Sequence, residues 1–157
     1  MPPHDHTGDD IATVVIREAR SVTPELVTSL ARLVPQLSSS AAALEASDVE
    51  AIVTSNASIL LIAEDSDGSI VGSLTLGVFR VPSGVRAWIE DVVVDGGQRG
   101  RGIGAMLVNH AIERAGQAGA RSVDLTSRPS RVEANRLYQK LGFELRETNV
   151  YRWRSSK

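Results

Sequence analysis

The sequence contains no cysteine, and this absence removes several classes of function at once. This excludes small folds stabilised by disulfide bonds, zinc sites with cysteine ligands, and enzymes with a cysteine nucleophile. Cysteine is often absent from proteins that work in a reducing compartment, so we expect a cytoplasmic protein.

Long apolar runs and a strong excess of one charge are also lacking. No stretch approaches the roughly 18 apolar residues that a membrane helix needs, so we expect no membrane partner. The formal net charge of −2 gives no reason to expect nucleic acid as a partner. The first residues combine no basic segment with an apolar one, so no secretory signal is expected.

The remaining composition is typical of a globular chain, with 42% hydrophobic and 23% charged residues. The length of 157 residues fits one compact domain with a substantial core. Residues 1–10 are polar and include two prolines and a glycine, which is typical of a flexible tail. We therefore predict a tail over residues 1–10 and one domain over residues 11–157.

Apolar periodicity and turn residues predict an α/β domain with a mixed, mostly antiparallel central sheet flanked by helices. The first helix is expected to begin after Thr23, a good N-cap, and to end at Pro35. Further helices are expected from about residue 47 and at 103–118 and 133–141. Strands are expected at 13–19, 58–64, 70–81, 86–94, 122–126, 143–146 and 150–154. The predicted order is β-α-α-β-β-β-α-β-α-β-β.

The most informative segment is VVVDGGQRGRGIGAML, over residues 92–107. An apolar strand enters a glycine-rich loop, and a helix follows. Glycine permits positive φ and the close approach of a ligand, and the first turn of a helix offers unpaired amides that attract anions. Arg99 and Arg101 add positive charge. The segment therefore predicts a phosphate site, although a plain strand-to-helix turn can look similar.

Spacing excludes two common phosphate motifs. A Walker A loop needs Gly-Lys-Ser/Thr, whereas Ala105 and Met106 follow Gly104. A Rossmann fingerprint needs G-x-G-x-x-G near the first strand of a βαβ unit, and Gly100, Gly102 and Gly104 lack that spacing. A nucleotide-binding domain of either kind is not expected.

The pattern Arg99-x-x-Gly102-x-Gly104 resembles the acyl-CoA pyrophosphate motif of the GNAT N-acetyltransferase superfamily. The segment ANRLYQKLGF, over residues 134–143, is similar to the second signature of that superfamily, and the two stand in the expected order. The resemblance covers about residues 12–154. It implies a single-domain GNAT-like fold and an enzyme that transfers an acetyl group from acetyl-CoA to a primary amine by direct attack, without a metal.

The resemblance also implies which residues bind the cofactor. The pantetheine arm is expected to pair with a bulged strand end, which here would be formed by Val92, Val93 and Val94. These valines equally fit a buried strand. The amides expected to hold the pyrophosphate are those of Arg99, Gly100, Arg101, Gly102, Ile103, Gly104 and Ala105. Asn135 is a further candidate for contacting CoA, or else an exposed polar residue of its helix.

Two side chains are candidates for proton transfer. Tyr138 matches the family tyrosine near the CoA sulfur, where its phenol can protonate the thiolate; the alternative is a core aromatic. Glu90 stands where family members often carry an acid and is the candidate general base, with Asp91 as the fallback. Strand alternation predicts Trp88, Glu90 and Val92 on one face. Each carboxylate could instead pair with a surface arginine.

The chain departs from the family pattern at Arg131, where many members carry asparagine. Arg128 and Arg131 could bind the CoA 3′-phosphate, bind an acidic group of the acceptor, or remain solvated. Together with Arg80 and Arg86 they favour an acceptor that carries a carboxylate, such as an amino acid or peptide. We expect a small-molecule or peptide amine as acceptor, and the sequence leaves a homodimer open.

A second function from another class is a domain that binds acyl-CoA without catalysis, as a sensor or regulatory module. The presence of both Glu90 and Tyr138 favours the enzyme over the sensor, because a sensor needs neither a base nor an acid.

Overall fold

The structure is a computed structural model that describes residues 13–157, so the tail predicted over residues 1–10 lies outside the described residues. The chain divides into two compact units, one that ends at Thr126 and one that spans Ser127–Lys157. Among residues 13–157, the first unit carries the sheet, three α-helices and a short 3₁₀ helix, and the second carries one α-helix. A single domain over residues 11–157 stays a prediction.

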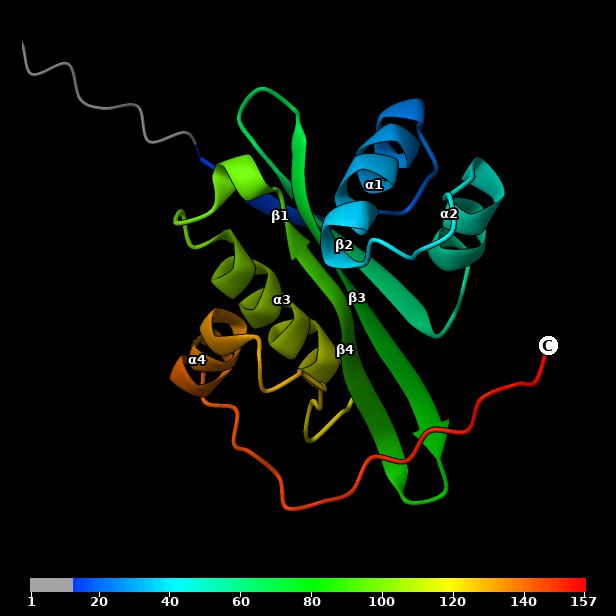
Figure 1. Cartoon of the computed structure of the whole chain (residues 1–157), viewed down its shortest axis with the longest axis vertical. Coiled ribbons are helices and arrows are strands. Elements are labelled where there is room, and N and C mark those ends of the chain that lie inside the picture. The colour runs from blue at the N-terminus through cyan, green and yellow to red at the C-terminus, as the bar shows by residue number, and fades with distance from the viewer. Residues whose placement is uncertain (1–12) are drawn as a thin grey trace, which may run out of the picture. The chain divides into compact units, whose positions relative to one another are not determined.

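Four antiparallel strands form the sheet of the first unit (Figure 1). They are β1 (Val15–Glu18), β2 (Ser58–Glu64), β3 (Ile70–Val81) and β4 (Gly84–Val94), in the spatial order β1-β2-β3-β4. The bounds of β2 and β3 match the prediction, because both strands are continuous apolar runs closed by turn residues.

The strand predicted at residues 122–126 is reduced to a single parallel bridge between Trp88 and Asp124. The Ile89 amide donates to the Asp124 carbonyl at 2.9 Å, and the Asp124 amide donates to the Ala87 carbonyl at 3.0 Å. The four strands of the sheet pair antiparallel throughout, and this isolated bridge adds a single parallel contact beside β4.

Helices cover both faces of the sheet. Figure 1 shows α1 (Pro24–Leu37) and α2 (Ala46–Val53) on one side and α3 (Ile103–Gln117) on the other. The predicted cap of α1 is confirmed, since Thr23 Oγ1 accepts a hydrogen bond from the Leu26 amide at 3.2 Å. A short 3₁₀ turn, η1 (Gly96–Gln98), separates β4 from α3.

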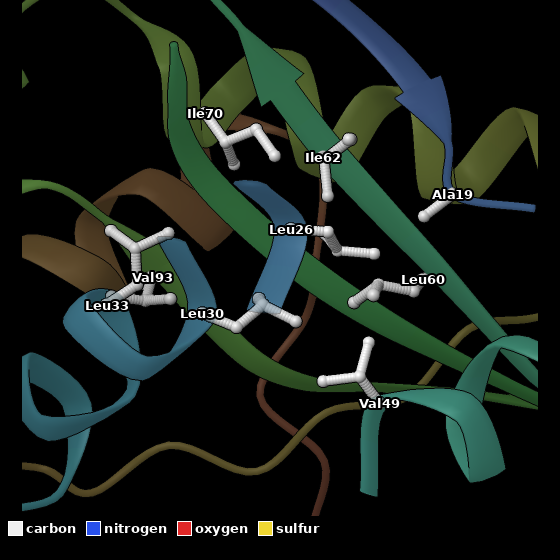
Figure 2. Close-up of a cluster of buried hydrophobic side chains, with 9 residues drawn as sticks. All are labelled: Ala19, Leu26, Leu30, Leu33, Val49, Leu60, Ile62, Ile70 and Val93. Atoms are coloured by element: carbon white, nitrogen blue, oxygen red, sulfur yellow. The ribbon is translucent and has the colours of Figure 1, made fainter. Parts of the chain in front are cut away.

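Apolar side chains of α1 and α2 pack on the sheet in the core shown in Figure 2. Leu26, Leu30 and Leu33 recur at helical spacing, and each is at most 4% exposed. Burial of each such side chain contributes about 1.5–3 kcal/mol. The cluster consists of Ala19, Leu26, Leu30, Leu33, Val49, Leu60, Ile62, Ile70 and Val93.

Helix α1 continues through Pro35, which was predicted to end it, and stops at Leu37. Proline has no amide hydrogen and therefore removes the helical hydrogen bond to the Ala31 carbonyl, yet the helix continues for two more residues. The Ser38 amide still donates to the Val34 carbonyl at 3.1 Å. The extension places Gln36 on the helix, and this residue contacts the glycine-rich loop.

The second unit contains α4 (Val132–Lys140), one residue earlier than predicted. The structure differs from the prediction after this helix, because residues 143–146 and 150–154 form no strand. Leu145, Val150, Tyr151 and Trp153 are 94%, 73%, 87% and 85% exposed. A strand requires a partner strand for its backbone groups, and neither segment forms a β-ladder with another described residue.

Candidate active site

The end of β4 carries a β-bulge, the feature that the resemblance implied. Thr75 of β3 pairs with Glu90, whereas Ser73 pairs with Val93, so one residue of β3 faces two residues of β4. Asp91 has a φ of 50°, and it is the only non-glycine residue with positive φ among residues 13–157. The bulge therefore lies at residues 91–92, directly after the candidate base.

The bulge changes which side chains share a face. Paired residues of an antiparallel ladder lie on the same face of the sheet. Across β3, Glu90 aligns with Leu60 and Val93 aligns with Ile62. Leu60 and Ile62 both belong to the core beneath α1 and α2. The prediction that Val92 shares the face of Glu90 is therefore wrong, because an inserted residue breaks the period of two. The bulge thus brings buried Val93 onto the face that carries Glu90.

The candidate base is accessible. Glu90 is exposed, and no ion pair or hydrogen bond with another residue of the range 13–157 engages its carboxylate. The same holds for Asp91, so neither acid pairs with a described surface arginine. Both carboxylates are therefore available to accept a proton, and the geometry keeps both candidates.

The outer edge of β4 opens next to Glu90. Along the edge away from β3, the hydrogen bonds to Asp124 end at Ile89. Beyond Ile89, no described residue extends the ladder on that edge, although Val93 and Val94 still pair with β3. On this outer edge, no described strand therefore competes with an extended ligand for the backbone of residues 92–94.

Two glycines shape the loop that follows. Gly100 and Gly102 have φ values of 83° and 75°, a region that non-glycine residues rarely adopt. A Cβ atom added to either residue would meet no other atom within 4 Å. Backbone conformation, rather than lack of space, is what favours glycine at both positions.

The loop delivers free amides at the start of α3. Gly102 is the N-cap, and the first helical hydrogen bond runs from the Met106 amide to the Gly102 carbonyl at 3.1 Å. The amides of residues 103–105 therefore have no acceptor within the helix, and they carry the positive end of its dipole. This arrangement can bind a phosphate group.

The two predicted loop arginines differ in their contacts. Arg101 donates to Asp65 at 3.0 Å and to Gln98 at 2.6 Å, which ties the loop to the turn between β2 and β3. The hydrogen bond from Arg101, and then that from the Ser66 amide, lowers the pKa of Asp65. The hydrogen bond to Asp65 in turn raises the pKa of Arg101. Arg99 is exposed in an extended conformation.

A second anchor at the start of the loop was not predicted. The Arg32 guanidinium forms an ion pair with Asp95 and donates to the Ile70 carbonyl at 2.8 Å. Gln36 donates to Asp95 at 3.4 Å and accepts from the Gly96 amide at 2.9 Å. Partial burial raises the pKa of Asp95, but the Gln36 hydrogen bond and the Arg32 charge outweigh it and lower that pKa overall. No local pattern relates residues about 60 positions apart.

Tyr138 lies on α4 in the second unit and is 9% exposed. Its ring meets Phe143 edge to face, with centroids 5.9 Å apart. Burial raises the pKa of the phenol above its usual 10.0, and the charge of Arg131 partly opposes this rise. The phenol is therefore protonated at neutral pH and can act as a proton donor.

Asn135, the other candidate of the second unit, has a structural contact. Its side-chain amide donates to the Arg128 carbonyl at 3.0 Å, and the Arg131 amide donates to the same carbonyl at 3.0 Å. Asn135 therefore holds the turn that precedes α4.

The structure thus gathers Glu90, the bulge and the amides of residues 103–105 into one strand–loop–helix segment of the first unit. Tyr138 and Asn135 belong to the second unit. Within residues 13–157, no three His, Asp or Glu side chains cluster as metal ligands. No helix in the same range is long and apolar enough to cross a membrane.

Comparison with known proteins agrees with this geometry. The family model of the acetyltransferase (GNAT) family matches residues 28–143, a range that includes Glu90, the loop and Tyr138. The chain belongs to the GNAT family. The resemblance read from the two motifs is therefore confirmed.

A curated relative is the L-methionine sulfoximine/L-methionine sulfone acetyltransferase of Pseudomonas paraeruginosa, which is 32% identical over 87 residues. The aligned part is 55% of this chain and 51% of that protein, so the chain spans about half the length of this relative.

Solved structures share the fold of this GNAT chain. A transcriptional regulator from Bacillus halodurans has 29% identity and a TM-score of 0.76, with 90% of this chain and 99% of that chain covered. A putative acetyltransferase from Agrobacterium tumefaciens has 25% identity and a TM-score of 0.78, with 89% and 99% covered. The predicted α/β GNAT-like fold class is confirmed.

Proposed function

We propose that this protein is an N-acetyltransferase that moves the acetyl group of acetyl-CoA to a primary amine. One observation carries the proposal. The bulge at residues 91–92 separates the exposed carboxylate of Glu90 from a glycine-rich loop with free helix amides, in a chain of the GNAT family. A proton acceptor and an anion site therefore lie on consecutive parts of one segment.

In the proposed complex, the pyrophosphate lies on the amides of residues 103–105, beside the exposed Arg99. The pantetheine arm pairs with the open backbone edge of residues 92–94, where the β4 ladder lacks an outer partner. Asn135 is a further candidate contact to CoA. A thioester is already activated toward amines, so the reaction needs no metal.

The proposed reaction is a direct transfer. Glu90 takes a proton from the acceptor ammonium, directly or through water, and the free amine attacks the thioester carbonyl carbon. The C–N bond forms, the C–S bond breaks, and the CoA thiolate takes a proton from the Tyr138 phenol. The nitrogen loses its second proton as the amide forms, and an equivalent proton returns through water to the Tyr138 phenolate. Positioning of the two substrates supplies much of the acceleration, and no covalent enzyme intermediate forms.

The acceptor that we propose is a small-molecule or peptide amine that also carries a carboxylate. Arg86, Trp88 and Glu90 alternate on β4 and share one face, with Arg86 held by Ser83 at 2.9 Å. A guanidinium on the face of the base suits an acceptor with an acidic group. The relative from Pseudomonas is named for acetylating two amino-acid derivatives, which agrees with this class.

The test of function combines an acceptor panel with one variant. Acetyl-CoA consumption is measured with amino acids, dipeptides and polyamines, and Tyr138→Phe is compared with wild type. We expect turnover on a carboxylate-bearing amine, and a loss of about 10²–10⁴-fold in Tyr138→Phe with acetyl-CoA binding retained. Wild type that binds acetyl-CoA but acetylates nothing would support the non-catalytic sensor. A preference for polyamines would overturn the acceptor class.

A further inference from the structure

Three side chains join helix α1 to the first two residues of the glycine-rich loop, and we call Arg32, Gln36 and Asp95 the Asp95 clamp. Arg32 and Gln36 stand one turn apart on α1, so both reach the same side of the helix. Arg32 holds the Asp95 carboxylate and the Ile70 carbonyl, and Gln36 holds that carboxylate and the Gly96 amide. The clamp therefore fixes a side chain and a backbone amide of the loop at once.

We propose that the Asp95 clamp positions the loop for the pyrophosphate of acetyl-CoA, so that α1 becomes a working part of the cofactor site. This inference rests on the proposed function. Between Asp95 and α3 the loop contains four glycines, which leave the unbound backbone many conformations. Anchoring its first residues lowers the entropy that cofactor binding must remove.

The clamp differs from an ordinary surface ion pair. An exposed pair such as Arg17 with Glu64, whose side chains are 51% and 31% exposed, holds two side chains that have no part in the loop. The Asp95 side chain is 25% exposed and accepts from two α1 side chains, while its own amide donates to the Val71 carbonyl at 2.8 Å. Helix, sheet and loop therefore meet at one residue.

Thermodynamic linkage gives the clamp a second consequence. The contacts with α1 favour the loop conformation that binds acetyl-CoA. Because such coupling is reciprocal, bound acetyl-CoA must stabilise those contacts by the same factor by which they strengthen its binding. Bound acetyl-CoA should therefore slow amide exchange in residues 32–37 as well as in the loop. This protection disappears when the clamp is broken.

The experiment compares Asp95→Asn, Gln36→Glu and the double variant with wild type. Asp95→Asn removes the charge that Arg32 holds, and Gln36→Glu sets two carboxylates against each other. The double variant exchanges the positions of amide and carboxylate and restores a complementary pair. Glu64→Gln breaks the Arg17 pair in the same unit and is the matched control.

Calorimetry with acetyl-CoA is the first readout, and amide exchange of residues 96–105 and 32–37 is the second. We expect Kd to rise about tenfold in each single variant, within the range of measured pair couplings, and to recover partly in the double variant. Exchange of the unliganded loop should accelerate in the single variants alone. Glu64→Gln should match wild type in both readouts.

Unchanged Kd values in folded single variants would overturn the inference, even if melting temperatures fell, because a structural role alone predicts that pattern. Gln36 is exposed, so Gln36→Glu remains informative if Asp95→Asn fails to fold. Wild type that binds no acetyl-CoA would defeat the proposed function instead. In that case, amide exchange of the unliganded loop would still show whether the clamp orders the loop. Exchange rates in the single variants equal to those of wild type would contradict the ordering role of the clamp.

Discussion

At the scale of single residues, the two neighbouring acids of β4 have different surroundings. Glu90 follows regular strand geometry, whereas Asp91 takes the left-handed φ of 50° that makes the bulge. Aspartate tolerates this region better than most residues, because its short side chain can bond locally, and glycine tolerates it best. Asp91 therefore has a structural reason to be there, and Glu90 has none that the described contacts reveal.

This difference gives a prediction about the base. Glu90→Gln should lower turnover by about 10²–10⁴-fold with unchanged acetyl-CoA binding, because the carboxylate that takes the proton is lost. Asp91→Gly should keep the bulge and leave turnover within a few-fold of wild type. Steady-state kinetics of both variants checks this. Loss of turnover in Asp91→Gly alone would make Asp91 the base.

The ion pair between Asp65 and Arg101 predicts a pH dependence. The pKa of Asp65 is lowered below its usual 3.8, so the pair stabilises the fold fully above that value and is lost as pH falls through the lower, folded pKa. Asp65→Asn should therefore be less stable than wild type at pH 7, and the gap should close in strong acid. Urea denaturation at pH 7 and at a series of acidic pH values that ends well below the usual pKa of 3.8 measures this. A gap that persists unchanged at low pH would contradict the assignment.

At the scale of elements, close packing of α3 on β3 depends on Gly72. A Cβ atom at this position would lie 3.0 Å from the Val93 carbonyl and 3.3 Å from Leu107. Gly116, on α3 itself, has no such neighbour within 4 Å. The two glycines therefore make a matched pair for testing the packing.

Gly72→Ala should destabilise the fold by about 1–3 kcal/mol, because the added methyl group overpacks the interface. Gly116→Ala should stabilise it by about 0.5–1 kcal/mol, because alanine favours a helix and restricts the unfolded chain. Thermal melting of both variants measures these changes. Equal effects in the same direction would contradict the packing described here.

The elements that could be predicted from the sequence are those with a strong local pattern. Apolar runs predicted β2 and β3, and helical spacing predicted α1 and α3, together with the loop between β4 and α3. The bulge could be expected only through the family resemblance, because its position depends on pairing with β3. The Asp95 clamp could not be predicted, since it joins residues distant in the chain.

At the scale of the whole molecule, the fold class followed from the sequence, but its last part did not. Residues 143–146 and 150–154 have alternating side chains that suggested strands, yet neither segment joins a β-ladder with another described residue. Alternation alone cannot supply the second strand that a ladder requires. The candidate site divides in the same way. Local motifs suggested its candidate residues, whereas the contacts that hold the loop depend on tertiary structure.

The proposed function depends on acetyl-CoA binding to the glycine-rich loop. Calorimetry of wild type beside Gly102→Asp and Gly102→Ala measures this binding. Gly102 has positive φ and open space around it, so alanine adds mainly backbone strain, whereas aspartate also adds a negative charge beside the expected pyrophosphate. We predict binding by wild type, weaker binding by Gly102→Ala and none detectable by Gly102→Asp. A folded wild-type protein that binds no acetyl-CoA would contradict the proposed cofactor site.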